Sequence, residues 1–283
     1  MRRLLAVMAA AFMVASAVAA PVEAGRRWQD QAPSNAPQVE AQCDSFNSGS
    51  HVGMENSTPS SSQNRSGVSA WVNISATQFD ICNNYILNAG PSAWIGIQPR
   101  TPTGLFPSTQ IMQLGVIECG GGTFVSYCQG ENNPHYVMAY GNCTGNFSGT
   151  IVDLGSAVSG DDATFSIYLM PDNYWHFSID GTEEFVLHDN YVSCWTRQGT
   201  DGGFYHDGLR KAVWAGERFN PGDSLGGLAT HERTYFQDAR FGRYNLGWSS
   251  PGWTAGQACY VKTAPDDRCT VVNDDTFYVY TSY

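Results

Sequence analysis

The chain has 283 residues and a formal net charge of −11 at pH 7, with 15 Lys and Arg against 26 Asp and Glu. This charge argues against a nucleic-acid binder and against binding to anionic membranes, because both need a basic face. All 8 cysteines lie beyond residue 42, and their even number indicates disulfide bonds formed in an oxidising compartment. They include no Cys-x-x-Cys pair and no Cys/His cluster at ligand spacing, so we expect no metal and no cofactor.

The N-terminus has the three parts of a secretory signal peptide. Two arginines give a basic start, an apolar run follows, and Ala17–Ala19 supplies small residues for cleavage. A membrane-spanning helix is the alternative, but the apolar run has the length of a signal core and no second run follows. We therefore expect a secreted, extracellular protein with a signal peptide at 1–19 and a disordered leader or short pro-segment at 20–42.

Short segments with strand composition dominate the remaining sequence, and helical periodicity is scarce. We expect strands at 67–74, 93–98, 111–117, 123–128, 136–140, 163–170, 174–179, 184–187, 212–219, 233–241 and 276–280. Turn residues such as Asp180-Gly181 separate these segments. Many short strands at this spacing are typical of a β-sandwich or barrel, and we expect one such domain over 43–242.

The clearest hairpin joins residues 166–170 to residues 175–179. Apolar and polar side chains alternate on both sides of a Pro171-Asp172-Asn173 turn. A period of two is that of a half-buried strand, so the pattern predicts two antiparallel strands joined by a tight turn.

The chain contains none of the common enzyme motifs: no Gly-x-Ser-x-Gly, no His-Glu-x-x-His, no P-loop and no dinucleotide fingerprint. Two predicted strands instead carry one polar residue among apolar or small neighbours. Gln113 shares a face with Gly115, and Glu217 shares a face with Val213 and Ala215. A carboxyl group held there would lose water, and its pKa would rise. The plain alternatives are a solvent-facing Gln113 and a surface ion pair between Glu217 and an arginine.

Five segments between residues 92 and 241 occur in the same order as motifs of a known family. They are Trp-Ile-Gly-Ile at 94–97, Ile-Met-Gln-Leu-Gly at 111–115, Val-Ser-Gly-Asp-Asp at 158–162 with the hairpin after it, Ala-Val-Trp-Ala-Gly-Glu at 212–217, and the stretch 228–239. As an ordered set, they resemble the eqolisins, which are glutamic peptidases.

This resemblance implies an all-β fold, a two-sheet antiparallel jelly-roll-like sandwich of the lectin and glucanase type. It implies a secreted endopeptidase in which Glu217 is the general acid/base that activates water and Gln113 stabilises the oxyanion. It assigns substrate contacts to Trp94, Gln98, Met138 and Trp214. The implied substrates are polypeptides, and the implied state is a monomer that binds neither nucleic acid nor membrane.

A non-catalytic, lectin-like carbohydrate-binding sandwich is the alternative function, because the same fold hosts sugar-binding modules. Some positions that are acidic in the eqolisins are occupied here by Gln98, Ile117, Met138 and Val213. Aromatic residues that could stack on sugars, with core packing as the alternative, are Trp175, Trp195, Tyr205, Trp248 and Trp253.

The cysteines allow about 105 pairings, of which Cys119–Cys128 and Cys259–Cys269 are favoured because each closes a short loop. Residues 243–283, outside the resemblance, are expected to form a disulfide-bearing extension packed on the sandwich. Only two lysines occur, and this scarcity, together with the acidic composition, fits a protein that works in acid.

Overall fold

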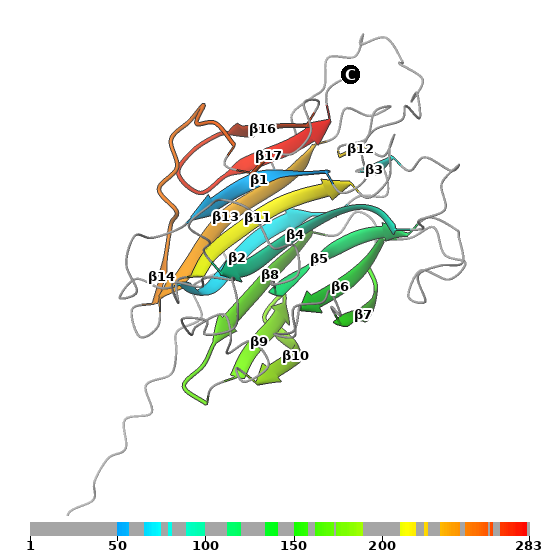
Figure 1. Ribbon diagram of the computed structural model, residues 1–283, viewed down its shortest axis with the longest axis vertical. Helices are drawn as coiled ribbons and strands as arrows, with labels where there is room; N and C mark the ends of the chain where they lie inside the picture. The colour runs from blue at the N-terminus through cyan, green and yellow to red at the C-terminus, as the bar shows by residue number, and fades with distance from the viewer. Residues whose placement is uncertain are drawn as a thin grey trace, which may run out of the picture. The chain divides into compact units, whose positions relative to one another are not determined.

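The computed structural model describes residues 50–56, 65–74, 79–80, 89–99, 112–119, 134–140, 150–157, 162–172, 174–188, 210–218, 224–225, 233–243, 247–259, 261–262 and 267–281. All of them belong to one compact unit, residues 36–283. They form seventeen strands, which Figure 1 labels in chain order. Within these ranges no helix is long and apolar enough to cross a bilayer.

Sheet A has seven strands in the order β15-β1-β11-β4-β5-β6-β7, all antiparallel. The strands are β1 Ser50–Asn56, β4 Ala89–Pro99, β5 Met112–Cys119, β6 Pro134–Tyr140, β7 Thr150–Ser156, β11 Arg210–Arg218 and β15 Val261–Lys262. β11 lies between β1 and β4, so segments far apart in the sequence are neighbours at the centre of this sheet (Figure 1).

Sheet B has eight strands in the order β10-β9-β8-β2-β13-β17-β16, with β14 paired to β13. The strands are β2 Arg65–Asn73, β8 Asp162–Leu169, β9 Tyr174–Ile179, β10 Thr182–His188, β13 Thr234–Arg243, β14 Gly247–Ser249, β16 Asp267–Val271 and β17 Phe277–Thr281. A small third sheet pairs β3 Phe79–Asp80 with β12 Ser224–Leu225.

The core lies between the inner faces of sheets A and B. In β5, Met112, Leu114 and Val116 are fully buried, and from sheet B the side chains of Phe165 and Trp175 join the same hydrophobic cluster. Burying each such side chain stabilises the fold by about 1.5–3 kcal/mol. The alternation of apolar and polar residues therefore decides which face of each strand turns inward, and the predicted all-β, two-sheet antiparallel sandwich is confirmed.

Each predicted strand coincides with an observed one, except 123–128, which lies outside the described residues. The predicted hairpin is β8 and β9, whose register pairs Ile167 with Phe177 and Tyr168 with His176. The strands that were not predicted include β1, β7 and β16.

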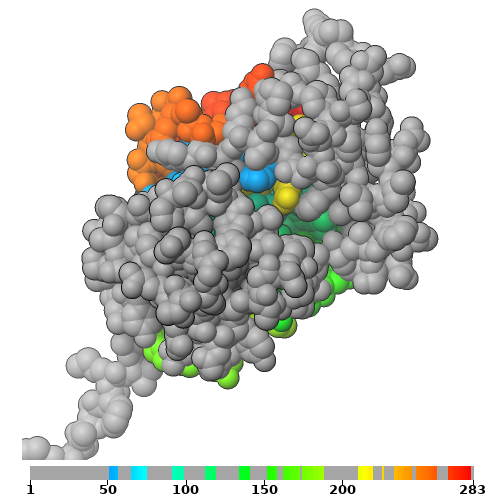
Figure 2. All heavy atoms as spheres, in the orientation of Figure 1, coloured from blue at the N-terminus to red at the C-terminus, as the bar shows by residue number. Residues whose placement is uncertain are grey.

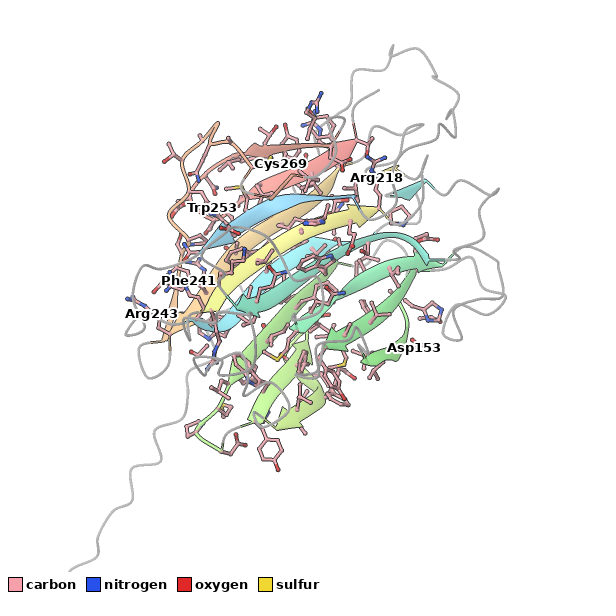
Figure 3. The ribbon with its side chains drawn as sticks, viewed as in Figure 1. Asp153, Arg218, Phe241, Arg243, Trp253 and Cys269 are labelled. Atoms are coloured by element: carbon pink, nitrogen blue, oxygen red, sulfur yellow. A yellow bond between two sulfur atoms is a disulfide. The ribbon has the colours of Figure 1, made fainter. Side chains whose placement is uncertain are left out.

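The segment 243–283 contributes strands to both sheets, since β17 pairs with β13 and β15 pairs with β1. Phe277 stacks on Phe236 with ring centroids 4.8 Å apart. Trp253, which Figure 3 labels, packs edge-to-face against both Trp214, at 5.1 Å, and Phe277, at 5.2 Å. This segment thus supplies core side chains as well as backbone pairing.

A buried ion pair and a disulfide hold the same segment in place (Figure 3). Nη2 of Arg218, at the end of β11, lies 2.8 Å from Oδ1 of Asp267, and both side chains are almost completely buried. The predicted disulfide Cys259–Cys269 is confirmed. The predicted Cys119–Cys128 pair lies outside the described residues, because Cys128 does.

Candidate functional site

The candidate site is on the outer face of sheet A, away from the core. Alternation in β11 turns the indole of Trp214 into the core and Val213, Ala215 and Glu217 to the other side. There Val213 and Ala215 form a second buried cluster with Trp94 of β4. In Figure 2, atoms of β1 (blue) and β11 (yellow) reach the surface next to each other.

The carboxyl group of Glu217 is bonded to the Trp94 side chain of this cluster. The indole Nε1–H of Trp94 donates a hydrogen bond to Oε2 of Glu217 at 3.1 Å. Part of Glu217 stays accessible, yet desolvation of its carboxyl group raises the pKa to about 7. The hydrogen bond from Trp94 favours the charged form and acts in the opposite direction. A carboxyl group with this pKa can both accept and donate a proton near neutral pH.

Two further polar side chains stand beside Glu217 in the sheet. His51 of β1 and Ser92 of β4 are its direct partners in the antiparallel register, one on each side. Directly opposed residues have their Cβ atoms about 5 Å apart on the same face. The Ser92 hydroxyl is buried and has no hydrogen-bond partner among the described residues. The structure therefore groups an imidazole, a carboxyl group and a hydroxyl on three adjacent strands.

Gln113 lies elsewhere on this face. It is opposite Gly96, and Gly96 is opposite Val213, so Gln113 aligns with Val213 rather than with Glu217. Two strand spacings of about 4.8 Å and four residues of about 3.3 Å place the Cα atoms of Gln113 and Glu217 roughly 16 Å apart. Side chains that stand on one sheet face at this separation do not meet at one carbonyl group. The structure does not bring the predicted pair together.

Two of the four residues assigned to substrate contact lie in the interior. Met138 and Trp214 are fully buried in the core between the sheets. The Trp214 Nε1–H donates a hydrogen bond to the Ser69 carbonyl oxygen, 2.9 Å away on the other sheet. These two side chains point away from the face that carries Glu217 and cannot contact a ligand there, which corrects the assignment.

Gln98, which was also assigned to substrate contact, belongs to a second polar group on the outer face of sheet A. It is opposite Lys211, whose Nζ lies 2.6 Å from Oε2 of Glu55 in a largely buried ion pair. Burial lowers the pKa of Lys211, and the carboxylate of Glu55 acts in the opposite direction. The side-chain oxygen of Gln98 is buried and accepts no hydrogen bond from the described residues. This group and Gln113 lie toward the other ends of the strands from Glu217.

The row of residues between the two polar groups is Gly53, Ala215, Trp94 and Gly115. Both glycines are required by close approach of the neighbouring strand. A Cβ atom on Gly53 would lie 2.0 Å from the Trp214 carbonyl oxygen, and one on Gly115 would lie 2.1 Å from a carbonyl oxygen of β4. The Trp94 indole is therefore the only large side chain in this row.

Glu118 is a second carboxyl group with a strongly raised pKa. Desolvation raises it to about 7, and the charge of His135 acts in the opposite direction. His135 Nδ1 is 3.1 Å from Oδ1 of Asp153, which Figure 3 labels. Among the described residues, no group of three or more His, Cys, Asp or Glu side chains could hold a metal ion.

Sequence reasoning missed Glu118, His51 and Ser92. Ser92 and Glu118 lie just outside the segments 94–97 and 111–115 and belong to neither of them. Only the strand register places His51 and Ser92 beside Glu217. Of the aromatic residues considered as sugar contacts, Trp175 and Trp253 are core residues, and Trp248 is exposed. Trp195 and Tyr205 lie outside the described residues.

No family model and no curated protein sequence matches the chain. Scytalido-glutamic peptidase, solved with a peptide-based transition state analogue, is 12% identical, with 83% of this chain and 97% of that chain covered and a TM-score of 0.46. SCP-B, a member of the Eqolisin family of peptidases, is 15% identical over 83% and 96%, with a TM-score of 0.43. A mixed-linkage glucan GH16 protein of Bacteroides ovatus is 13% identical over 64% and 68%, with a TM-score of 0.34. At these identities and TM-scores, the similarities assign no activity to this chain.

Proposed function

We propose that the chain is a secreted hydrolase, an endopeptidase of the glutamic type, in which Glu217 is the general acid/base. The observation that carries the proposal is the Glu217 carboxyl group, held by the Trp94 indole and given a pKa of about 7 by its surroundings. Strongly shifted carboxyl groups are typical of catalytic sites. The class of substrate rests on the ordered sequence motifs that resemble the eqolisins.

In the proposed reaction, ionised Glu217 accepts a proton from a water molecule as the water oxygen attacks the scissile carbonyl carbon. The tetrahedral intermediate then collapses, the C–N bond breaks, and protonated Glu217 donates its proton to the leaving amine nitrogen. Since the base must be ionised, a pKa of about 7 moves the expected working range toward neutral pH, above the acidic range that the composition suggested.

The proposal assigns the oxyanion to the Ser92 hydroxyl instead of Gln113. Ser92 is directly opposite Glu217, and its hydroxyl donates to no acceptor among the described residues. A donor in this place could stabilise the negative oxygen as it forms. Gln113, roughly 16 Å from Glu217 between Cα atoms, is too far to share the same carbonyl group.

The test is cleavage of denatured casein and of a quenched fluorescent peptide library by the secreted chain, from pH 3 to pH 8. Glu217→Gln should lower the rate by about 10²-fold or more and Ser92→Ala by about 10²-fold. Gln113→Ala should stay within a few-fold of wild type and is the matched control on the same sheet face. Undiminished cleavage by Glu217→Gln would overturn the proposal. Absence of cleavage by the wild-type chain at every pH would favour the non-catalytic, carbohydrate-binding alternative.

A further inference from the structure

Exposed hydrophobic side chains gather on the outer face of sheet B, the face opposite to its core side. In the described part of the chain, the large hydrophobic residues with at least 37% exposure include Met170, Tyr174, Val186 and Trp248. The register places Tyr174, Val186 and Trp248 on this face, and Met170 directly follows the end of β8. Single exposed hydrophobic residues are ordinary, whereas a gathered set marks a binding surface.

The centre of this surface is a row across five strands. Trp248 of β14 is opposite Gly242, which is opposite Gly67, and Gly67 is opposite Tyr168. Two adjacent glycines thus leave the backbone bare between the two aromatic residues. Tyr168 is in turn opposite His176 of β9.

The glycines make room for the indole of Trp248. A Cβ atom on Gly67 would lie 2.9 Å from Cη2 and 3.2 Å from Cζ3 of the Trp248 ring, so this part of the indole lies directly over Gly67. Although one side is covered by backbone in this way, Trp248 is still 46% exposed. The arrangement is a supported aromatic platform that is open to solvent.

The neighbouring rings are fixed beside this platform. The Tyr168 ring is 6.4 Å from the indole of Trp248 at an interplanar angle of 75°, and it stacks on His176 at 5.4 Å and 11°. His176 is held between two carboxylates, with its Nδ1 bonded to Glu183 and its Nε2 3.3 Å from Oδ2 of Asp172. The next row along the strands carries hydroxyl groups. Among them are Ser69 of β2 and Ser166 of β8, whose side chains are hydrogen-bonded to each other.

We propose that this face binds a neutral polysaccharide, with a sugar ring stacked on the open side of the Trp248 indole. The flat ring suits the C–H face of a pyranose, and the adjacent hydroxyl and carboxylate oxygens can hydrogen-bond sugar hydroxyls. The carboxylates of Asp172 and Glu183, in a chain of net charge −11, disfavour an anionic polysaccharide by like-charge repulsion. The surface belongs to the other sheet from Glu217, so it can bind a glycan whether or not the chain cleaves peptides.

The experiment is retention of the full secreted chain on insoluble cellulose, β-1,3-glucan and chitin, and mobility in gels that contain soluble neutral glucans. Trp248→Ala should weaken binding about tenfold or more, because it removes the stacking surface. Val272→Ala removes an exposed hydrophobic residue that is not in this row, and it should bind as wild type does. Glu217→Gln should also bind as wild type.

Several results would overturn the inference. They are retention on none of the neutral glycans, binding to alginate or pectate alone, and equal binding by Trp248→Ala and wild type. Retention through a protein partner in place of a glycan would count against it as well. Circular dichroism and the melting temperature of Trp248→Ala, compared with Val272→Ala, show whether the variant is folded. The proposed peptidase activity is measured separately, so failure of either proposal leaves the other standing.

Discussion

The raised pKa of Glu217 predicts how the stability of the fold depends on pH. The pKa of Glu217 is about 7 in the folded chain, against an ordinary value of 4.5 for a glutamate carboxyl group. Between these values the folded chain binds more protons than the unfolded chain, so the contribution of Glu217 is complete below pH 4.5 and is lost as the pH rises through 7. At about 1.4 kcal/mol for each tenfold change in proton affinity, this difference in pKa corresponds to between about 3 and 4 kcal/mol in total, of which about 3 kcal/mol falls between pH 4.5 and pH 8.

Glu217→Gln carries no titrating group at this position and resembles the protonated carboxyl in shape. We expect wild type to lose about 3 kcal/mol more than Glu217→Gln in free energy of unfolding between pH 4.5 and pH 8. Glu118, whose pKa is also raised to about 7, should add a loss in the same direction to both proteins. Glu118→Gln should remove the part of the loss in free energy of unfolding that Glu118 contributes.

The measurement is urea-induced unfolding, followed by tryptophan fluorescence, at intervals of half a pH unit. Glu184→Gln is the matched control, because it removes an exposed carboxyl group from a strand of sheet B. Parallel pH profiles for wild type and Glu217→Gln would refute the reasoning, since they would mean that folding leaves the proton affinity of Glu217 unchanged.

Three further predictions concern other contacts. Asp267→Asn should lower the free energy of unfolding by about 3–5 kcal/mol in urea denaturation, because it removes the charge from the buried carboxylate that pairs with Arg218. Gly115→Ala should cost about 1–3 kcal/mol or more in the same assay, since its Cβ atom would lie 2.1 Å from a backbone oxygen. Trp94→Phe should raise the pKa of Glu217 further, by removing the hydrogen bond that favours the charged form, and NMR titration of the Glu217 carboxyl carbon would detect this.

Each of these has a matched comparison. Asp238→Asn removes an exposed partner of Arg240 and should cost under about 1 kcal/mol, so an equal cost for Asp267→Asn would contradict the importance of burial. The comparison for Gly115→Ala is Ala139→Gly, which makes the opposite change, from alanine to glycine, in the same sheet. A lowered Glu217 pKa in Trp94→Phe would mean that the indole disfavours the carboxylate.

The fold could be predicted from the sequence because alternation of apolar and polar residues reports directly which face of a strand is buried. Strands β8 and β9 show this well, because their buried residues alternate with more exposed ones. In β11, Trp214 turns inward while Glu217 turns outward, as their spacing indicates. Strand β1 has Gly and His among few apolar residues and was missed, although it pairs with β11 along its whole length.

The distance between Gln113 and Glu217 along the sheet could not be predicted in the same way. Alternation places both on the outer face of sheet A, but it does not state which residues are opposite each other. A shift of two residues keeps a side chain on its face and moves it by about 7 Å along the strand. The hydrogen-bond ladder between β11, β4 and β5 sets this register, and it puts Ser92, not Gln113, beside Glu217.

The pairing of β17 with β13 and of β15 with β1 bears on how the chain folds during synthesis. β1 and β15 are separated by about two hundred residues of sequence, and β13 lacks one neighbour until the last strand emerges. Such long-range pairing slows folding and leaves an open strand edge in the incomplete chain, which is a template for aggregation. A nascent chain of this protein therefore remains vulnerable until its C-terminal residues are available, and truncation before β17 should yield insoluble material.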